Sequence, residues 1–167
     1  MIVVGGEALV DLVEEHGLLS PVPGGGPFNT AIALGRLGIP VAFLGTLSHD
    51  EYGGLLARLL LEAGVDMSLV RWSDAPTPLA IVHRQNDGEN SYTFYLTGTS
   101  LTDLPPEAVP ALPEYVSAIH VGTLGLAGCP RGNVATGCPG YQFKRRTRIS
   151  RDSGRRRICV IRRPDFF

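Results

Sequence analysis

Three consecutive glycines, Gly24 to Gly26, are followed three residues later by Asn29, and these residues have the clearest capacity for chemistry. They stand before and inside the first turn of a predicted helix, where unpaired N–H groups and the helix dipole favour oxygen-rich or anionic ligands. Asp11 adds a carboxylate within an apolar run, and it must reach solvent or meet donors because burying it unpaired is costly. These residues either cradle a ligand or form an ordinary loop before an ordinary helix.

Several common binding motifs do not fit the sequence. A Walker A motif needs a lysine, and residues 1–127 contain none. The stretch "GGGPFN" offers G-x-G-x-x-N in place of the dinucleotide fingerprint, and "SPVP" before it is a poor strand. His49, His83 and His120 are scattered without metal-ligand spacing, and we expect His120 to be a core histidine. The three cysteines include no C-x-x-C pair, so neither a zinc site nor a disulfide framework is predicted.

Hydrophobic spacing predicts the elements that hold these residues. The opening "MIVVGGEALVDLV" is typical of a buried strand that breaks at a Gly-Gly pair and resumes towards Asp11. A helix is predicted over 27–37, ended by Gly38 and Pro40. The pattern then predicts a strand over 41–48, a helix with a Ser48–Glu51 capping box that ends at Gly64, a strand over 65–72, a hairpin over 78–96 and a buried strand ending near Gly122. Such alternation is typical of a parallel α/β sheet.

The composition divides the chain in two. With 167 residues and 44 % hydrophobic content, one domain with a core is expected. No basic flank precedes the N-terminal apolar residues and acidic residues interrupt them, so we expect no signal peptide or membrane span and a cytoplasmic protein. Residues 1–127 hold four Arg, no Lys and 14 acidic residues, whereas residues 128–167 hold ten Arg and one Lys against two Asp. Leucine is the commonest residue before this division and is absent after Leu126.

The stretch "GGGPFNTAIALGRLGIPVAFLGTLSHDEYG" resembles the first signature of the PfkB, or ribokinase-like, carbohydrate kinases. It contains the glycines, a proline, the asparagine, small helix residues and a G-x-x-x-x-D-x-x-G stretch made by Gly45, Asp50 and Gly53. The resemblance extends to Asp11, to Thr77 before "PLAIVHR", to "TFYLTG" and to "IHVGTLGL", and it covers residues 1 to about 127. It implies an α/β fold: a ribokinase-like parallel-sheet core with a small β lid, truncated after about residue 127.

The resemblance also implies a sugar site. Asp11 would accept hydrogen bonds from sugar hydroxyls, Gly24, Gly25 and Gly26 would let the backbone approach the sugar, and Asn29 would fix a further hydroxyl. A carboxylate, an amide and bare backbone N–H groups suit such a dense array of hydroxyls. The implied partner is a small sugar, with fructose preferred on the likeness of "GGGPFNTA".

The same resemblance implies that the hairpin strands within 78–96 form a lid over the sugar. Lids of this family often pair between subunits, which implies a homodimer. Phe28, Phe94 and Tyr95 are candidates to shape the pocket, although core packing is the favoured use of Phe94.

Each singled-out residue keeps a structural alternative. Asp11 can serve as a strand-end carboxylate, Asn29 as a solvated helix residue and Gly53 as a helix-packing glycine. Taken together, the residues favour a sugar site.

The resembled enzymes transfer the γ-phosphoryl group of ATP with Mg²⁺, using a G-A-G-D-type base motif, an anion hole and nucleotide loops from their C-terminal half. None of these motifs follows Ala127. We therefore assign no catalytic, cofactor-binding or metal-binding residue to this chain. ATP and Mg²⁺ are implied for the intact enzyme, the missing motifs put their binding here in doubt, and the chain alone is expected not to turn over.

The segment 128–167 has two interpretations. Clustered guanidinium groups suit phosphates, so the tail is a candidate arm for nucleic acid. We favour out-of-frame translation, which accounts for the abrupt change in leucine, charge and cysteine usage, and such a tail is expected to be disordered. The remaining alternative is a non-catalytic sugar-binding remnant.

Overall fold

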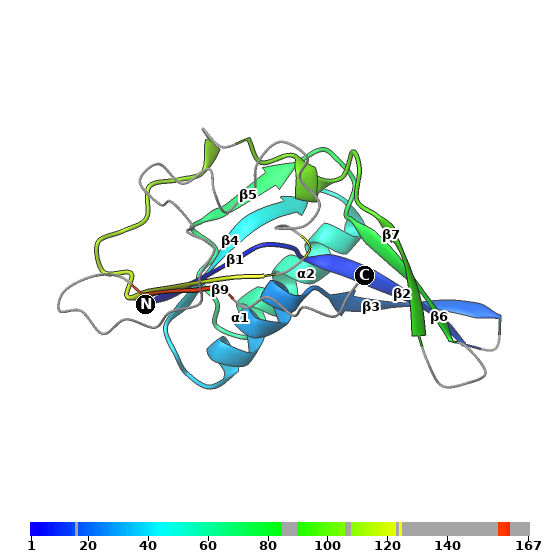
Figure 1. Ribbon diagram of the computed structural model, residues 1–167, viewed down its shortest axis with the longest axis horizontal. Coiled ribbons are helices and arrows are strands. Elements are labelled where there is room, and N and C mark those ends of the chain that lie inside the picture. Colours follow the sequence, from blue (N-terminus) through cyan, green and yellow to red (C-terminus); the bar gives the residue numbers. More distant parts are fainter. Residues whose placement is uncertain (16, 85–89, 106–107, 123, 125–156, 161–167) are drawn as a thin grey trace.

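The structure is a computed structural model that describes residues 1–15, 17–84, 90–105, 108–122, 124 and 157–160 (Figure 1). It contains a parallel core sheet in the order β5-β4-β1-β8-β9 and a second sheet, here called the lid sheet, in the order β3-β2-β6-β7. The elements are β1 (Ile2–Gly5), β2 (Leu9–Glu15), β3 (Leu18–Gly24), α1 (Gly26–Arg36), β4 (Val41–Ser48), α2 (Glu51–Glu62), β5 (Val70–Ser73), β6 (Leu79–Arg84), β7 (Asn90–Tyr95), the 3-10 helix η1 (Ser100–Thr102), β8 (Ala118–Val121) and β9 (Arg157–Val160). The predicted α/β class, with a parallel core and a small β lid, is confirmed.

The two helices pack on one face of the core sheet. Phe28 of α1 and Leu56 and Leu60 of α2 are fully buried in one cluster with Phe43 and Leu47 of β4. Burying one such side chain contributes about 1.5–3 kcal/mol, so this layer is a main source of stability. A second cluster lines the opposite face, and it is made by Val3, Ala42, Leu69, Val116, Ile119 and Val121.

The predicted end of the first helix is confirmed in detail. Gly38 has a φ of 72°, and its N–H donates to the carbonyl of Gly35 at 2.9 Å. The N–H of Ile39 donates to the carbonyl of Leu34 at 3.0 Å. These two bonds satisfy carbonyls in the last turn of α1 and form a Schellman motif.

The predicted capping box of α2 is wrong. The N-cap residue is Asp50, whose carboxylate accepts from the N–H of Gly53 at 2.8 Å. Ser48 lies two residues earlier, at the end of β4, and its hydroxyl oxygen accepts from the N–H of Asp50 at 3.0 Å. The S-x-x-E pattern was matched two residues too early because an aspartate that caps equally well stands just before Glu51.

The prediction that "SPVP", before the glycines, is a poor strand is also wrong. Residues 18–24, which contain "SPVP", form β3, and this strand pairs antiparallel with β2 from Leu9↔Gly24 to Glu15↔Leu18. Pro21 and Pro23 are tolerated because β3 is an edge strand of the lid sheet. The predicted strand over 65–72 is shorter, since β5 begins at Val70.

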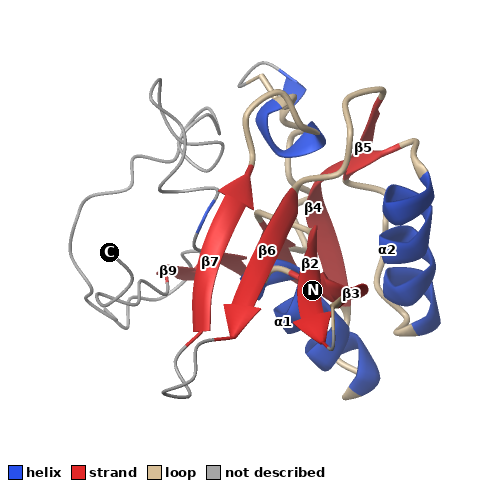
Figure 2. Cartoon of the chain, turned by 90° about the vertical axis from the view of Figure 1, so that its right-hand side faces the viewer, coloured by secondary structure: helices blue, strands red, loops and turns tan. Residues whose placement is uncertain are grey.

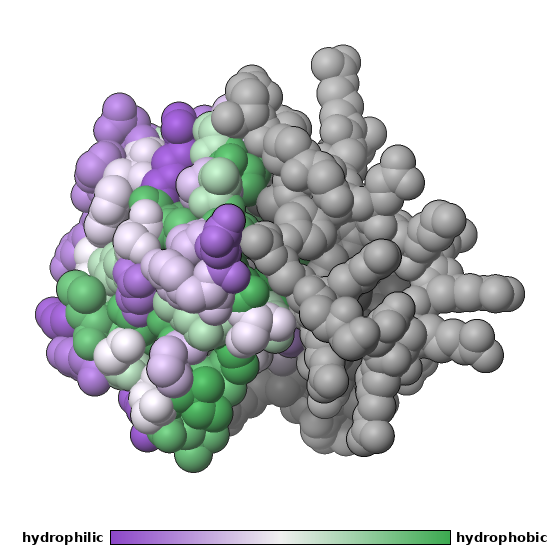
Figure 3. All heavy atoms as spheres, turned by 90° about the vertical axis from the view of Figure 1, so that its left-hand side faces the viewer, coloured by the Kyte–Doolittle hydropathy of each residue, from purple (hydrophilic) through white to green (hydrophobic). Residues whose placement is uncertain are grey.

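The lid sheet lies beside the core sheet (Figure 1), and its strands β7, β6 and β2 run side by side in Figure 2. The predicted hairpin is confirmed as β6 and β7, which pair antiparallel, while its turn lies outside the described residues. Large exposed apolar side chains gather on the lid strands, and these are Leu18, Leu19, Val22, Tyr92, Phe94 and Tyr95. On the face shown in Figure 3, hydrophilic and hydrophobic side chains are interspersed over the described residues.

Four residues of the arginine-rich tail, Arg157–Val160, form β9, which pairs in parallel with β8. The sequence analysis expects a disordered tail and predicts no strand at this position, so the expectation is wrong for these four residues. The rest of the tail, including Cys129 and Cys138, lies outside the described residues. Within the part of the chain that the structure describes, no helix is both long and apolar enough to cross a membrane.

Candidate active site

The chain order of the core sheet reverses between β1 and β8. From β1 the chain continues to β4 and β5 on one side, whereas β8 lies on the other side of β1. In open parallel sheets, ligands bind outside the carboxyl ends of the strands at such a switch point. Gly5 pairs with Val121 at these ends, and the chain leaves β1 through Gly6 to enter the lid sheet. The topology therefore places the candidate site where the core and lid sheets meet.

Asp11 lies on β2 of the lid sheet, close to this junction. A Cβ atom at Gly24 would collide with the Asp11 carboxylate, so the two residues are in close contact. The side chain is half-buried, and burial raises the pKa of Asp11. No donor in the described part of the chain bonds to this carboxylate. Because burial destabilises the charged form of Asp11, hydrogen-bond donors supplied by a ligand would stabilise this carboxylate.

Gly25 and Gly26 lead from β3 into α1. Gly25 is the N-cap residue with a φ of 108°, and a Cβ atom there would lie 2.6 Å from the carbonyl oxygen of Glu7. Asn29 lies in the first turn, where its N–H donates to the carbonyl of Gly25 at 2.9 Å and its side chain is exposed. The structure thus brings Asp11 against the glycine segment, and Asn29 follows within one helical turn.

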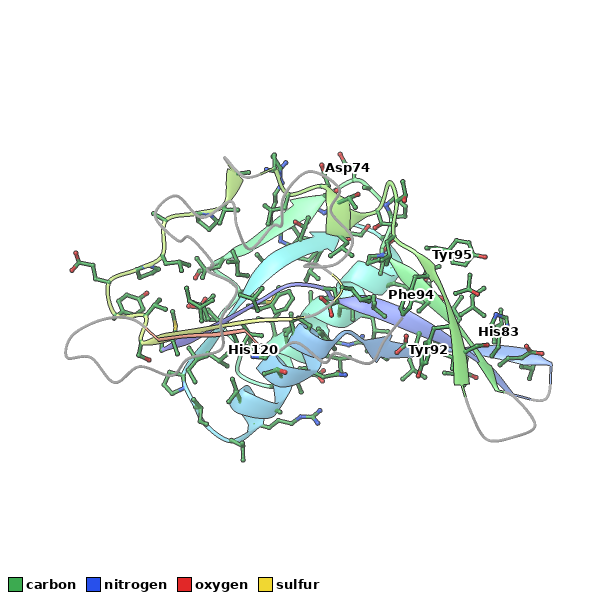
Figure 4. All side chains as sticks on the ribbon, in the orientation of Figure 1. Asp74, His83, Tyr92, Phe94, Tyr95 and His120 are labelled. Atoms are coloured by element: carbon green, nitrogen blue, oxygen red, sulfur yellow. The ribbon has the colours of Figure 1, made fainter. Side chains whose placement is uncertain are left out.

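Two aromatic side chains extend this site along the lid sheet. Ala80 of β6 pairs with Asp11 on one side and with Phe94 on the other, so all three residues lie on one face of the sheet. Tyr92 is two residues from Phe94 on β7 and stacks on it, with ring centroids 5.9 Å apart and an interplanar angle of 9°. In Figure 4, Phe94 and Tyr92 lie on one side of β7 and Tyr95 on the other.

These positions correct three sequence-based assignments. Phe94 is 44 % exposed, so the favoured use in core packing is wrong. Phe28 is 1 % exposed inside the core, so its side chain is covered by other core residues, and Tyr95 lies on the opposite face of the lid sheet from Asp11. The sequence analysis missed Tyr92, although side chains two apart in a strand share a face, and this alternation could have found it.

Glu7 and His120 are two ionisable residues that interact electrostatically. Glu7 is 1 % exposed, follows β1, and interacts with other groups. His120, labelled in Figure 4, belongs to β8 and is half-buried. Burial lowers the pKa of His120, and the negative charge of Glu7 opposes that shift. The prediction of His120 as a core histidine is therefore only partly met, because its ring keeps some access to solvent.

The other motif residues have structural partners. A Cβ atom at Gly53 would collide with the backbone of Ser48, which favours the helix-packing role of this glycine. His49 stacks on Trp72 with ring centroids 5.3 Å apart. Among the described residues, no three His, Cys, Asp or Glu side chains form a group that could hold a metal ion.

Comparison with known proteins decides the family. The family described as pfkB family carbohydrate kinase matches residues 3–135. The chain belongs to this family. The chain is similar to a fructokinase of Rhizobium leguminosarum bv. trifolii, 37% identical over 137 residues, and to one of Escherichia coli, 37% identical over 107 residues. These alignments cover 79% and 60% of this chain but 42% and 35% of the relatives, so the chain spans less than half of their length.

Solved structures show the same pfkB fold. The fructokinase of Xylella fastidiosa with bound ATP superposes with a TM-score of 0.64 at 31% identity, covering 72% of this chain and 38% of that one. The fructokinase of Vibrio cholerae O395 in its fructose, ADP and calcium ion bound form gives a TM-score of 0.66 at 26% identity, covering 77% of this chain and 42% of that one. The predicted resemblance to ribokinase-like kinases is confirmed.

ATP would supply the phosphoryl group in a kinase of this family. The described residues of this chain do not fit the Mg²⁺ ion that would accompany ATP, because no three His, Cys, Asp or Glu side chains among them form a group that could hold a metal ion. The sequence likewise lacks a G-A-G-D-type motif. No step of phosphoryl transfer is therefore assigned to residues of this chain.

Proposed function

We propose that residues 1–127 form the sugar-binding part of a pfkB carbohydrate kinase fold. The observation that carries this proposal is the half-buried Asp11 carboxylate, which lies against Gly24 in the lid sheet without a donor among the described residues. A sugar hydroxyl that donates to Asp11 would replace the water lost on burial and stabilise the charged carboxylate. Fructose is the first candidate, because the relatives named above are fructokinases.

The other site residues follow from this geometry. Gly24 to Gly26 pass Asp11 without side chains that would block a ligand, and the exposed Asn29 side chain offers a donor and an acceptor one turn into α1. Phe94 and Tyr92 present stacked rings on the same face of the lid sheet. A pyranose or furanose ring has an apolar face of C–H groups that such rings can cover, and its hydroxyls remain for the polar residues.

We propose further that the chain alone does not phosphorylate sugar. Phosphoryl transfer needs a base, donors for the transferred group and a cation, and no residue of this chain has been assigned to any of them. The test incubates purified residues 1–167 with ATP, Mg²⁺ and fructose and measures ADP release. Sugar-dependent ADP release above that of a heat-inactivated sample contradicts this part of the proposal.

Two expectations stay predictions. A homodimer through the lid sheet is supported by its exposed apolar side chains, and sedimentation velocity of the full chain tests it. The nucleic-acid arm and the out-of-frame origin both concern residues 128–167, of which only β9 is described. Loss of salt-sensitive oligonucleotide binding on removal of this segment would favour the arm.

A further inference from the structure

Asp50 caps α2, but two of its three accepted hydrogen bonds come from elsewhere. Its carboxylate accepts from the N–H of Thr77 at 2.7 Å and from the hydroxyl of Thr77 at 2.6 Å, in addition to the capping bond from Gly53. Thr77 is 4 % exposed and lies two residues before the lid strand β6. A helix cap requires only the bond from Gly53, so the bonds to Thr77 have a separate structural consequence.

These bonds connect α2 to the strand that carries Asp11. The residue after Thr77 is Pro78, which is fully buried, and its carbonyl accepts from the N–H of Val10 at 3.1 Å. Val10 immediately precedes Asp11 on β2 and pairs with Leu79 on β6. The hydrogen-bonded path therefore runs from Asp50 through Thr77 and Pro78 to the backbone beside Asp11.

Pro76, the residue before Thr77, also bonds to the chain that follows the β6–β7 hairpin. The carbonyl of Pro76 accepts from the N–H of Ser100 at 2.9 Å, and Ser100 follows β7 by five residues. Both ends of the β6–β7 hairpin are thus fixed next to Thr77. Restraining Thr77 therefore restrains the start of β6 and, through Pro76, the segment that follows β7.

We propose that Asp50 is a positioning residue for the sugar site: through Thr77 and Pro78, it fixes the lid strand that holds Asp11 against Gly24. The anchor, by which we mean the two hydrogen bonds from Thr77 to the Asp50 carboxylate, is seen directly in the structure. Its effect on sugar binding rests on the proposed function. Asp50 does not touch the sugar and acts only through the backbone of β6 and β2.

Two substitutions separate the anchor from the helix cap. In Asp50→Ser the shorter hydroxyl can still accept from Gly53, but it cannot also bond both donors of Thr77. In Thr77→Val the cap is untouched and the hydroxyl donor is lost. Thr77→Ser keeps that donor and is the conservative variant. Asp66→Ser is the matched control, because Asp66 accepts from the N–H of Ser68 at 2.8 Å in a turn before β5, outside the lid sheet.

The primary test is amide hydrogen exchange of the full chain without sugar, read at Val10 and, within α2, at Leu60. Losing one hydrogen bond to the partly buried Asp50 carboxylate changes the equilibrium constant for local opening by about tenfold. We expect Asp50→Ser and Thr77→Val to exchange the Val10 amide about tenfold faster with Leu60 unchanged, and Thr77→Ser and Asp66→Ser to match the wild type. Unchanged exchange at Val10 in both anchor variants overturns the proposal, as does equal acceleration in Asp66→Ser.

The second test is calorimetry with fructose on the same proteins. We expect Asp50→Ser and Thr77→Val to bind fructose about tenfold more weakly than wild type, and Thr77→Ser to restore the affinity. Wild-type affinity in both anchor variants, combined with faster exchange at Val10, overturns the role of Asp50 in positioning Asp11. A wild-type chain that does not bind fructose overturns the proposed function, and the exchange at Val10 still decides the anchor.

Discussion

Gly25→Ala should destabilise the fold far more than the same change at Gly38. Both residues have a positive φ, 108° at Gly25 and 72° at Gly38. A Cβ atom at Gly38 would meet nothing within 4 Å, whereas at Gly25 it would lie 2.6 Å from the carbonyl oxygen of Glu7. Gly38→Ala therefore tests backbone strain alone, and Gly25→Ala tests strain together with a collision at the candidate site.

The magnitudes follow from these two differences. At Gly38, a left-handed alanine costs about 1–2 kcal/mol, partly offset by about 0.4–1 kcal/mol of lost freedom in the unfolded chain. At Gly25, the backbone strain of about 1–3 kcal/mol adds to about 1–3 kcal/mol for the collision, because the Glu7 oxygen belongs to the backbone and cannot rotate away. We expect a total near 4 kcal/mol, a large fraction of the ~5–15 kcal/mol that stabilises a domain.

Thermal unfolding of both variants measures the difference. For a chain of this size, the expected loss lowers Tm by about 8–16 °C in Gly25→Ala and by about 2–4 °C in Gly38→Ala. Urea unfolding with an unchanged m-value would show that stability, and not the extent of unfolding, has changed. Equal Tm values for the two variants would refute the close approach of Gly25 to Glu7 on which the geometry of the site depends.

Two further predictions concern titration and the aromatic face. Burial opposes ionisation of Asp50, but the hydrogen bonds that its carboxylate accepts from Thr77 and Gly53 outweigh it and lower its pKa below the ordinary 3.8. The ionised carboxylate therefore stabilises the fold above pH 3.8, and this contribution is lost as pH falls through the lowered pKa. We compare the free energies of unfolding of wild type and Asp50→Asn in urea titrations at several pH values. Their difference should stay constant from roughly pH 5 to 7 and shrink below pH 3.8. A difference that does not depend on pH contradicts this prediction. Phe94→Ala should weaken fructose binding about tenfold in calorimetry, whereas Tyr95→Ala should not, because the two rings lie on opposite faces of β7; equal losses would place the sugar elsewhere.

The elements around the site were predictable from sequence where local signals agree. The helix over α1 follows from apolar spacing and from the Gly38 stop, and β4 follows from its apolar run. The strand β3 was missed because its prolines oppose a strand locally, while pairing with β2 in the lid sheet overrides that preference. Tertiary pairing of this kind leaves no local signal.

The candidate site was predictable in residue type but not in arrangement. Asp11 and the glycines were identified through a family resemblance, yet their contact depends on the antiparallel pairing of β2 with β3. The role of Phe94 was misjudged because strand alternation does not say which face is buried. The bonds between Asp50 and Thr77 join residues 27 positions apart, which no local pattern could indicate.

Fructose binding by the full chain and by Asp11→Asn tests the central claim most directly. We expect wild type to bind in calorimetry, and its affinity to fall as pH drops through the raised pKa of Asp11, because only the carboxylate accepts strongly from sugar hydroxyls. Asp11→Asn should bind about tenfold more weakly near neutral pH and lose this pH dependence. Wild-type affinity in Asp11→Asn, with the same pH profile, would contradict the assignment of the sugar site.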